Sequence, residues 1–126
     1  MGLRAELKTH LESIFGDGYA VYDSGVDVLK TPCVVINPSS PYQVPTTMGA
    51  DARIQSFLDI WLVTNRTSPK DALNHLEEMR KLASLGVKSF LPRGAWSQFG
   101  QLGSTTVSGV DYATGVMQTV FIGEDI

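Results

Sequence analysis

The segment that most constrains the fold of this 126-residue chain is RIQSFLDIWLVT, Arg53 to Thr64, the longest strand-like run in the sequence. Successive side chains of a strand point to opposite faces of a sheet. One face of this run carries the aliphatic residues Ile54, Leu58, Ile60 and Leu62. The other face carries Gln55, Phe57, Asp59, Trp61 and Val63. Because the second face is also too apolar to be left in water, the strand needs a cover on both sides.

Two amphipathic helices are predicted, one before and one after this strand in the sequence. The first covers residues 3–15, where apolar residues recur at helical spacing, and Gly16 ends it. The second begins after Ser68, a good capping residue, with Pro69 at the first helical position. We expect it to end near Leu85, with Gly86 as its left-handed stop.

The remaining segments are assigned from their turn residues and their β-branched runs. YAVYDSGVDVLK (19–30) predicts a short strand or a hairpin, and PCVVI (32–36) predicts a short strand. GVKSFLPRGAWSQFGQLGS (86–104) is interpreted as irregular. TTVSGVDYATGVMQTVFI (105–122) predicts two strands that are joined through Asp111 to Gly115.

This order of elements predicts a single α+β domain over residues 1–126. It would have a mixed or antiparallel sheet of about five strands, two helices packed on one face, and a long loop between strands 2 and 3. Two helices can cover only one face, so Phe57, Trp61 and Val63 need another cover. Either the segments around Trp96 and Phe99 fold back over them, or another subunit does, and the sequence leaves both alternatives open.

The predicted long loop is NPSSPYQVPTTMGA, Asn37 to Ala50, which contains three of the six prolines. Proline removes backbone donors, and no apolar period continues across the stretch. Loops longer than about a dozen residues in compact domains are usually functional or disordered. Tyr42, Val44 and Met48 give this segment apolar surface to bury, so we expect an arm that orders against a neighbour. Shortening it should leave the domain folded and block assembly.

Composition indicates a globular chain with no internal disulfide. Apolar residues make up 43%, charged residues 18%, and the formal net charge is −3. Cys33 is the only cysteine, which fits a reducing cytoplasm. The N-terminal segment carries charges throughout, so we expect no signal peptide and no membrane association.

The common catalytic and metal-binding motifs are missing from the sequence. HLEE at 75–78 lacks the second histidine of a zinc protease, and GDG at 16–18 lacks the remaining glycine of a dinucleotide fingerprint. We therefore expect no catalytic residue, no metal and no cofactor. One enzyme alternative stays open, in which Cys33 acts as a nucleophile with His75 or His10.

Charge is distributed unevenly along the chain. Six basic residues lie between Arg66 and Arg93, and none follows Arg93. The simplest interpretation is a solvated helix face; the alternative is a surface that complements a second, acidic one in an oligomer or a stack. The basic residues that could line a passage for DNA without reading its sequence are Lys70, Arg80, Lys81, Lys88 and Arg93.

The order of segments resembles that of the tail terminator (tail completion) proteins of long-tailed bacteriophages. The resemblance is carried by the N-terminal helix, YAVYDSG, TPCVVINP, ARIQSFLDIWLVTN, SPKDALNHLEEMRKLA and VDYATGVMQTVFI. Its most telling part is the pattern R-x-Q-x-x-x-D-x-W from Arg53 to Trp61. It covers nearly the whole chain and depends on layout more than on an invariant motif.

The resemblance implies a structural virion protein at the head-proximal end of the tail. Such proteins form a ring, usually a hexamer, on the last ring of the major tail tube protein, stop tube polymerisation and join the head connector or neck protein. From their apolar or aromatic side chains, not from the resemblance, the residues expected at the subunit interface or the tube contact are Tyr42, Val44, Met48, Phe57, Trp61, Val63 and Trp96. A head-side neck or head-completion ring protein is the alternative within virion proteins.

Overall fold

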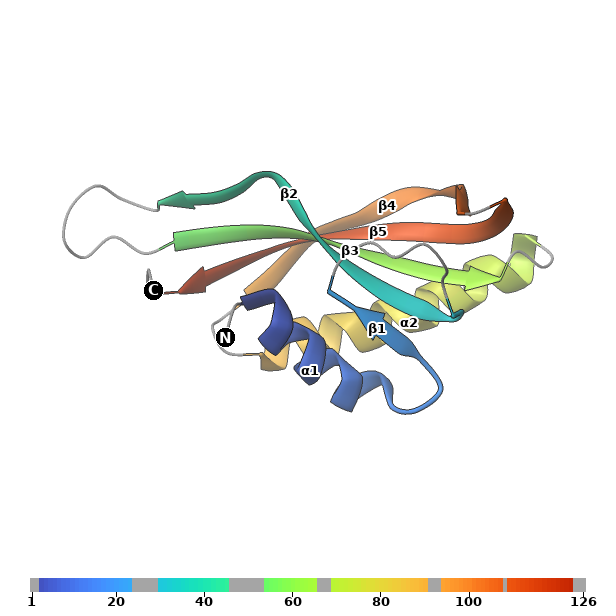
Figure 1. Ribbon diagram of the computed structural model, residues 1–126, viewed down its shortest axis with the longest axis horizontal. Coiled ribbons are helices and arrows are strands. Elements are labelled where there is room, and N and C mark those ends of the chain that lie inside the picture. The colour runs from blue at the N-terminus through green and yellow to red at the C-terminus, as the bar shows by residue number, and fades with distance from the viewer. Residues whose placement is uncertain are drawn as a thin grey trace.

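The computed structural model describes residues 3–23, 30–45, 54–65, 69–90, 94–107 and 109–123 (Figure 1). Two helices and five strands follow one another along the chain: α1 (Leu3–Phe15), β1 (Ala20–Tyr22), β2 (Cys33–Pro45), β3 (Ile54–Asn65), α2 (Pro69–Ser89), β4 (Gly94–Val107) and β5 (Val110–Gly123). The α+β fold class predicted from the sequence is confirmed.

The strands form one open, mixed sheet in the order β1-β2-β3-β5-β4. β1 pairs with β2 in parallel, and every other pairing is antiparallel. β3 and β5 are paired along their whole length, from Ile54 opposite Gly123 to Asn65 opposite Tyr112. The strand recognised first in the sequence is therefore the central strand of the sheet.

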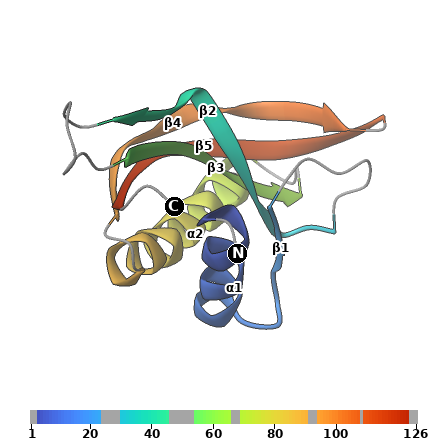
Figure 2. The same ribbon diagram turned by 60° about the vertical axis from the view of Figure 1, so that its left-hand side comes forward.

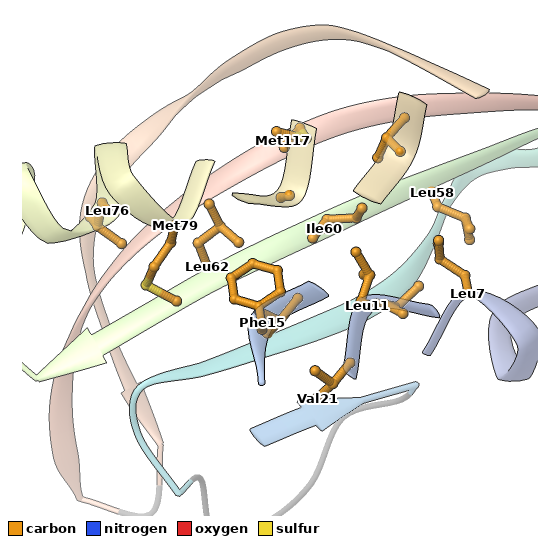
Figure 3. Packing of buried hydrophobic residues seen from close by; sticks show 14 of the residues in the cluster. Leu7, Leu11, Phe15, Val21, Leu58, Ile60, Leu62, Leu76, Met79 and Met117 are labelled. Carbon is orange, nitrogen blue, oxygen red and sulfur yellow. The ribbon is translucent and has the colours of Figure 1, made fainter. Parts of the chain in front are cut away.

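Both helices lie on the same side of the sheet, as Figure 2 shows. Figure 3 shows the core between them, where Leu11 and Phe15 of α1 and Met79 of α2 approach the aliphatic face of β3. Leu58, Ile60 and Leu62 on that face are fully buried, as predicted from the alternation of β3. Gly16, with φ of 79°, ends α1 at the expected position.

The C-terminal end of α2 differs from the prediction. The helix continues through Gly86 to Ser89, so Gly86 is not its stop. A Cβ atom at Gly86 would lie 2.5 Å from Leu11 Cδ2 of α1. Glycine at this position therefore allows a close approach of the two helices instead of a left-handed turn.

The segment that was expected to be irregular forms the last turn of α2 and β4. The expected turn through Asp111 to Gly115 is also wrong, because β5 runs unbroken from Val110. β4 ends at Val107 and β5 begins at Val110, opposite it in the ladder, and Gly109 just before β5 has a φ of 81°. β4 has few β-branched residues, so its strand form depends on pairing with β5, which local sequence signals do not report.

The stretch Asn37–Ala50, which was predicted to be a loop, begins as part of a strand. β2 continues to Pro45, with a register irregularity between Pro38 and Gln43, and Gln43 pairs with Ser56. The prolines are accommodated because β1 pairs with β2 only as far as Val35, which leaves the rest of β2 at an edge of the described sheet. Residues 46–53 of the β2–β3 connection, with Met48, lie outside the described residues. So do residues 24–29 of the segment 19–30, for which a short strand or a hairpin was predicted.

Candidate functional site

The face of the sheet that points away from α1 and α2 is the strongest candidate for a functional surface (Figure 2). We call it the open face, and define it by the β3 residues that alternate with the core residues and by their partners on β5. These pairs are Gln55 with Ile122, Phe57 with Val120, Asp59 with Gln118, Trp61 with Val116 and Val63 with Thr114. Paired residues of an antiparallel ladder share a face, so the open face extends across the sheet.

One end of the open face is an apolar cluster. Cys33, Val35, Val63 and Tyr112 are buried in it, and Trp61 is among the half-buried residues that pack against them. This cluster is separate from the core beneath the helices. The large aromatic surface of Trp61 remains partly exposed, which is typical of an interface anchor.

A polar row crosses the open face next to this cluster. Asn37 on β2 pairs with Asp59, Asp59 pairs with Gln118, and Gln118 pairs with Gln98 on β4. The row therefore runs over four adjacent strands. The alternation of β3 alone places Asp59 on this face, but it does not identify the neighbours of Asp59, because strand register decides which residues align.

Apolar residues continue beyond the polar row. Phe57 and Val120 are paired and half-buried, and Ile122 on the same face of β5 is 38% exposed. Val44 of β2 lies opposite Gln55, at the same end of the sheet. The open face thus has an apolar region on each side of a polar row, and this arrangement suits an interface with a defined register.

The predicted interface residues are divided between the two sides of the sheet. Phe57, Trp61 and Val63 belong to the open face, whereas Tyr42 and Trp96 pack against the core on the helix side. Met48 lies outside the described residues.

Trp96 is held against α2. Its Nε1 donates a hydrogen bond to Ser84 Oγ at 2.9 Å, and the guanidinium of Arg80 lies 5.3 Å from the ring centroid. Phe99 also packs against the helix-side core. The hypothesis that the segments around Trp96 and Phe99 cover the open face is therefore wrong, because their side chains point to the other face.

The basic residues proposed for a DNA passage lie mainly on one surface of α2. Lys70, Lys81 and Lys88 are exposed, and their spacing of 11 and 7 residues places them on one stripe of the helix. Arg80 is half-buried against Trp96, and Arg93 lies outside the described residues.

The groups of the enzyme alternative do not come together. Cys33 is fully buried in the open-face cluster, and burial raises the pKa of its thiol to about 11. His75 lies on the helix side, where its Nε2 is 3.1 Å from Tyr19 Oη and its Nδ1 is 2.7 Å from Thr64 Oγ1. A thiol that remains protonated at neutral pH, with the sheet between it and the imidazole, does not form a nucleophile pair with that imidazole.

The second histidine is hydrogen-bonded elsewhere. His10 Nε2 lies 2.8 Å from Ser89 Oγ, while Ser89 Oγ donates to the carbonyl oxygen of Leu85, also at 2.8 Å. The Ser89 hydroxyl hydrogen is thus engaged by a helix carbonyl, so His10 donates to Ser89 Oγ. This contact joins α1 to the end of α2.

Within the described ranges, no three histidine, cysteine, aspartate or glutamate side chains are grouped so that they could hold a metal ion. In the same part of the chain, neither helix is both long and apolar enough to cross a membrane. No model of a known protein family matches the chain, and no curated protein matches it.

Proposed function

We propose that this protein is a structural component of a phage virion, a tail terminator. It would form a ring on the end of the tail tube, end tube polymerisation, and provide the surface to which the head joins. The resemblance in segment order suggests this function, and the observation that carries it in the structure is the open face. That face presents apolar surface from four adjacent strands, and no helix of the described residues lies on it.

The composition of the open face fits a contact between subunits. Interface centres are rich in aromatic residues and poor in charged ones, and energy concentrates at a few anchors. Phe57 and Trp61 are half-buried aromatic residues of this face, and Asp59 is the one charged residue of β3. We assign the anchor role to Trp61, because the buried cluster on one side supports its ring.

A ring needs a heterologous contact, in which the open face of one subunit meets a different surface of the next. The outer stripe of α2 is a candidate for that second surface, since Leu85 there is 59% exposed beside Lys81 and Lys88. Its lysines would meet the carboxylate of Asp59. Lys70 lies on the same stripe but 11 residues before Lys81, and in this arrangement it would line a DNA passage beyond the contact.

Electron microscopy of the purified protein, alone and mixed with purified tail tubes, tests this function. We expect rings, or caps on one end of the tubes, and tubes that no longer elongate when tube protein is added. Trp61→Lys should abolish both rings and caps, because it places a charge at the proposed anchor. Leu102→Lys, which changes an exposed leucine on β4, is the matched control and should cap normally.

Three results would contradict the proposal. One is the failure to form rings in either setting together with failure to bind tube ends. Another is capping by Trp61→Lys at the wild-type level, which would show that the open face is not part of the contact. The third is binding to the head connector but not to the tube, which would indicate the head-side neck protein instead.

A further inference from the structure

The two edges of the sheet differ in how well they are protected against pairing with another strand. One edge is formed by β1, which has only three residues, and by the part of β2 beyond it. That part of β2 contains Pro38, Pro41 and Pro45. Short strands and prolines are the usual means by which proteins prevent edge-to-edge association.

The opposite edge, β4, has neither of these protections. It is 14 residues long and contains no proline and no charged residue. Its register against β5 shifts between Trp96 and Gln98 and between Gly100 and Gly103, and the last five residues, 103–107, pair without interruption. The two shifts interrupt the edge as bulges do, so its regular part is residues 103–107, about 16 Å long at about 3.3 Å per residue.

Charge is depleted over the whole β4–β5 hairpin. The 30 residues from Gly94 to Gly123 contain one charged side chain, Asp111, although charged residues make up 18% of the chain. Leu102 on β4 is 52% exposed, and Ser104 and Thr106 are also exposed. A solvent-facing edge strand normally carries charge, so its absence here indicates a surface that is covered in an assembly.

We propose that the β4 edge binds the β4 edge of a second copy of this chain, antiparallel and about a twofold axis. The two five-stranded sheets would then form one continuous sheet of ten strands. Because identical residues lie near one another across a twofold axis, a charged strand would repel its own copy, whereas β4 has no charge to repel.

Among the described strands of a second copy, no other is suitable. Its opposite edge lacks donors at three prolines and is shielded by β1 as far as Val35. Pairing of β4 with that edge, which would produce an open chain of sheets, is therefore disfavoured. Pairing of β4 with β4 closes as a dimer.

This contact is distinct from the one proposed for the ring. The ring depends on the open face of the sheet and on a heterologous contact, whereas the edge contact is isologous. Trp61→Lys is expected to remove the first and leave the second. The failure of one proposal can therefore be distinguished from the failure of the other.

Sedimentation velocity of the Trp61→Lys variant across a concentration series tests the edge contact. We expect a dimer that dissociates on dilution. Adding Ser104→Lys should abolish the dimer, because two lysines would face each other across the seam. Adding Asn74→Lys, at an exposed position of α2, is the matched control and should leave the dimer intact. A Trp61→Lys variant that is monomeric at its highest soluble concentration overturns the proposal.

Single cysteines on β4 provide a second measurement, which does not depend on the ring contact. Cys33 is buried, so oxidative cross-links would report the introduced thiol. Three variants are compared, Ser97→Cys, Leu102→Cys and Ser104→Cys. We expect the yield of disulfide-linked dimer to be highest for the variant whose cysteine lies nearest the twofold axis. Asn74→Cys should form none. Equal cross-linking at every position, Asn74→Cys included, would reflect random collisions and contradict the pairing.

Discussion

Gly86 is the residue at which local preference and tertiary packing conflict most clearly. In an exposed helix interior, alanine is about 1 kcal/mol more favourable than glycine. Gly86 is buried, and a Cβ there would meet Leu11 Cδ2 at 2.5 Å. Leu11 is itself fully buried, so its side chain would have to shift within the core. Overpacking of such sites costs about 1–3 kcal/mol, so the steric term outweighs the helix preference.

Gly86→Ala should therefore lower the free energy of unfolding by about 1 kcal/mol, measured by urea denaturation. In a Leu11→Ala background the clash is removed, and the same substitution should raise stability by up to about 1 kcal/mol. The sign reversal is the diagnostic result. A Gly86→Ala protein more stable than the wild type would show that the helices separate at no cost.

Cys33 predicts a pH dependence that is confined to alkaline solution. Burial raises the pKa of its thiol from 9.0 to about 11. The unfolded chain releases this proton first, so stability due to Cys33 is complete below pH 9 and is lost as the pH rises through about 11. The loss would be about 2–3 kcal/mol over this window. Cys33→Ala should lack this component of the alkaline decline, measured by denaturation at pH 8, 9, 10 and 11.

Lysine and tyrosine titrate in the same range, so the difference between the two proteins is the informative quantity. An identical alkaline decline in the wild type and in Cys33→Ala would refute the assignment. A thiol reagent needs an exposed thiolate, so Cys33 of the native protein should resist it at pH 8. The reaction should occur only through unfolding and be limited by it.

Among the elements, His75 joins three different segments of the chain. Its ring contacts Tyr19, in the connection between α1 and β1, and Thr64, at the end of β3, from its own position on α2. Thr64 is 4% exposed, so a lost hydrogen bond at this site would be replaced poorly by water. This junction fixes the start of α2 against the sheet.

Thr64→Val keeps the shape of the side chain and removes the hydroxyl. We expect it to lower the free energy of unfolding by about 1–2 kcal/mol, because His75 Nδ1 loses its partner. Thr9→Val is the matched control, since Thr9 lies on the exposed side of α1 and should change stability by less than about 0.5 kcal/mol. Equal effects of the two substitutions would show that the junction contributes nothing specific.

Aromatic side chains support the glycine-rich strands of the hairpin. A Cβ at Gly115 of β5 would lie 2.6 Å from Phe99 Cζ of β4, and the ring of Phe121 lies over Gly94 in the same way. In each pair the aromatic ring fills the space that a glycine leaves on the neighbouring strand. This cross-strand packing explains why a segment with weak strand propensity forms β4.

At the scale of the whole molecule, the two sides of the sheet are unequal. The helix side has a continuous core drawn from both helices and all five strands, whereas the open face has a smaller cluster at one end. Besides these two faces, the sheet has a long β4–β5 hairpin, which Figure 1 shows. The proposed ring uses the open face, and the proposed dimer uses the hairpin edge.

Tryptophan fluorescence can report whether another subunit covers the open face. In a Trp96→Phe variant, Trp61 is the remaining tryptophan. We expect its emission maximum to shift to the red on dilution, as a half-buried ring loses its neighbour and becomes hydrated. Sedimentation of the same samples would show whether dilution dissociates the assembly. An emission maximum that is unchanged down to a demonstrated monomer would argue against subunit cover of Trp61.

The strongest local patterns in the sequence were enough to predict much of the fold. The helical spacing of 3–15, the Pro69 start of α2 and the alternation of β3 led to the α+β class and to the aliphatic face of the core. They also revealed the apolar second face of β3. These features depend on residues close together in the chain, so a periodicity analysis detects them.

Only the tertiary structure decided the features that depend on distant partners. Gly86 continues a helix because of Leu11, β4 is a strand because of β5, and the stretch from Asn37 begins as an edge strand because β3 pairs with it. Register aligned Asp59 with Asn37 and Gln118 into one polar row. The physical reason is common to all of them: the stabilising contact is made by a residue remote in sequence, and no local pattern encodes its position.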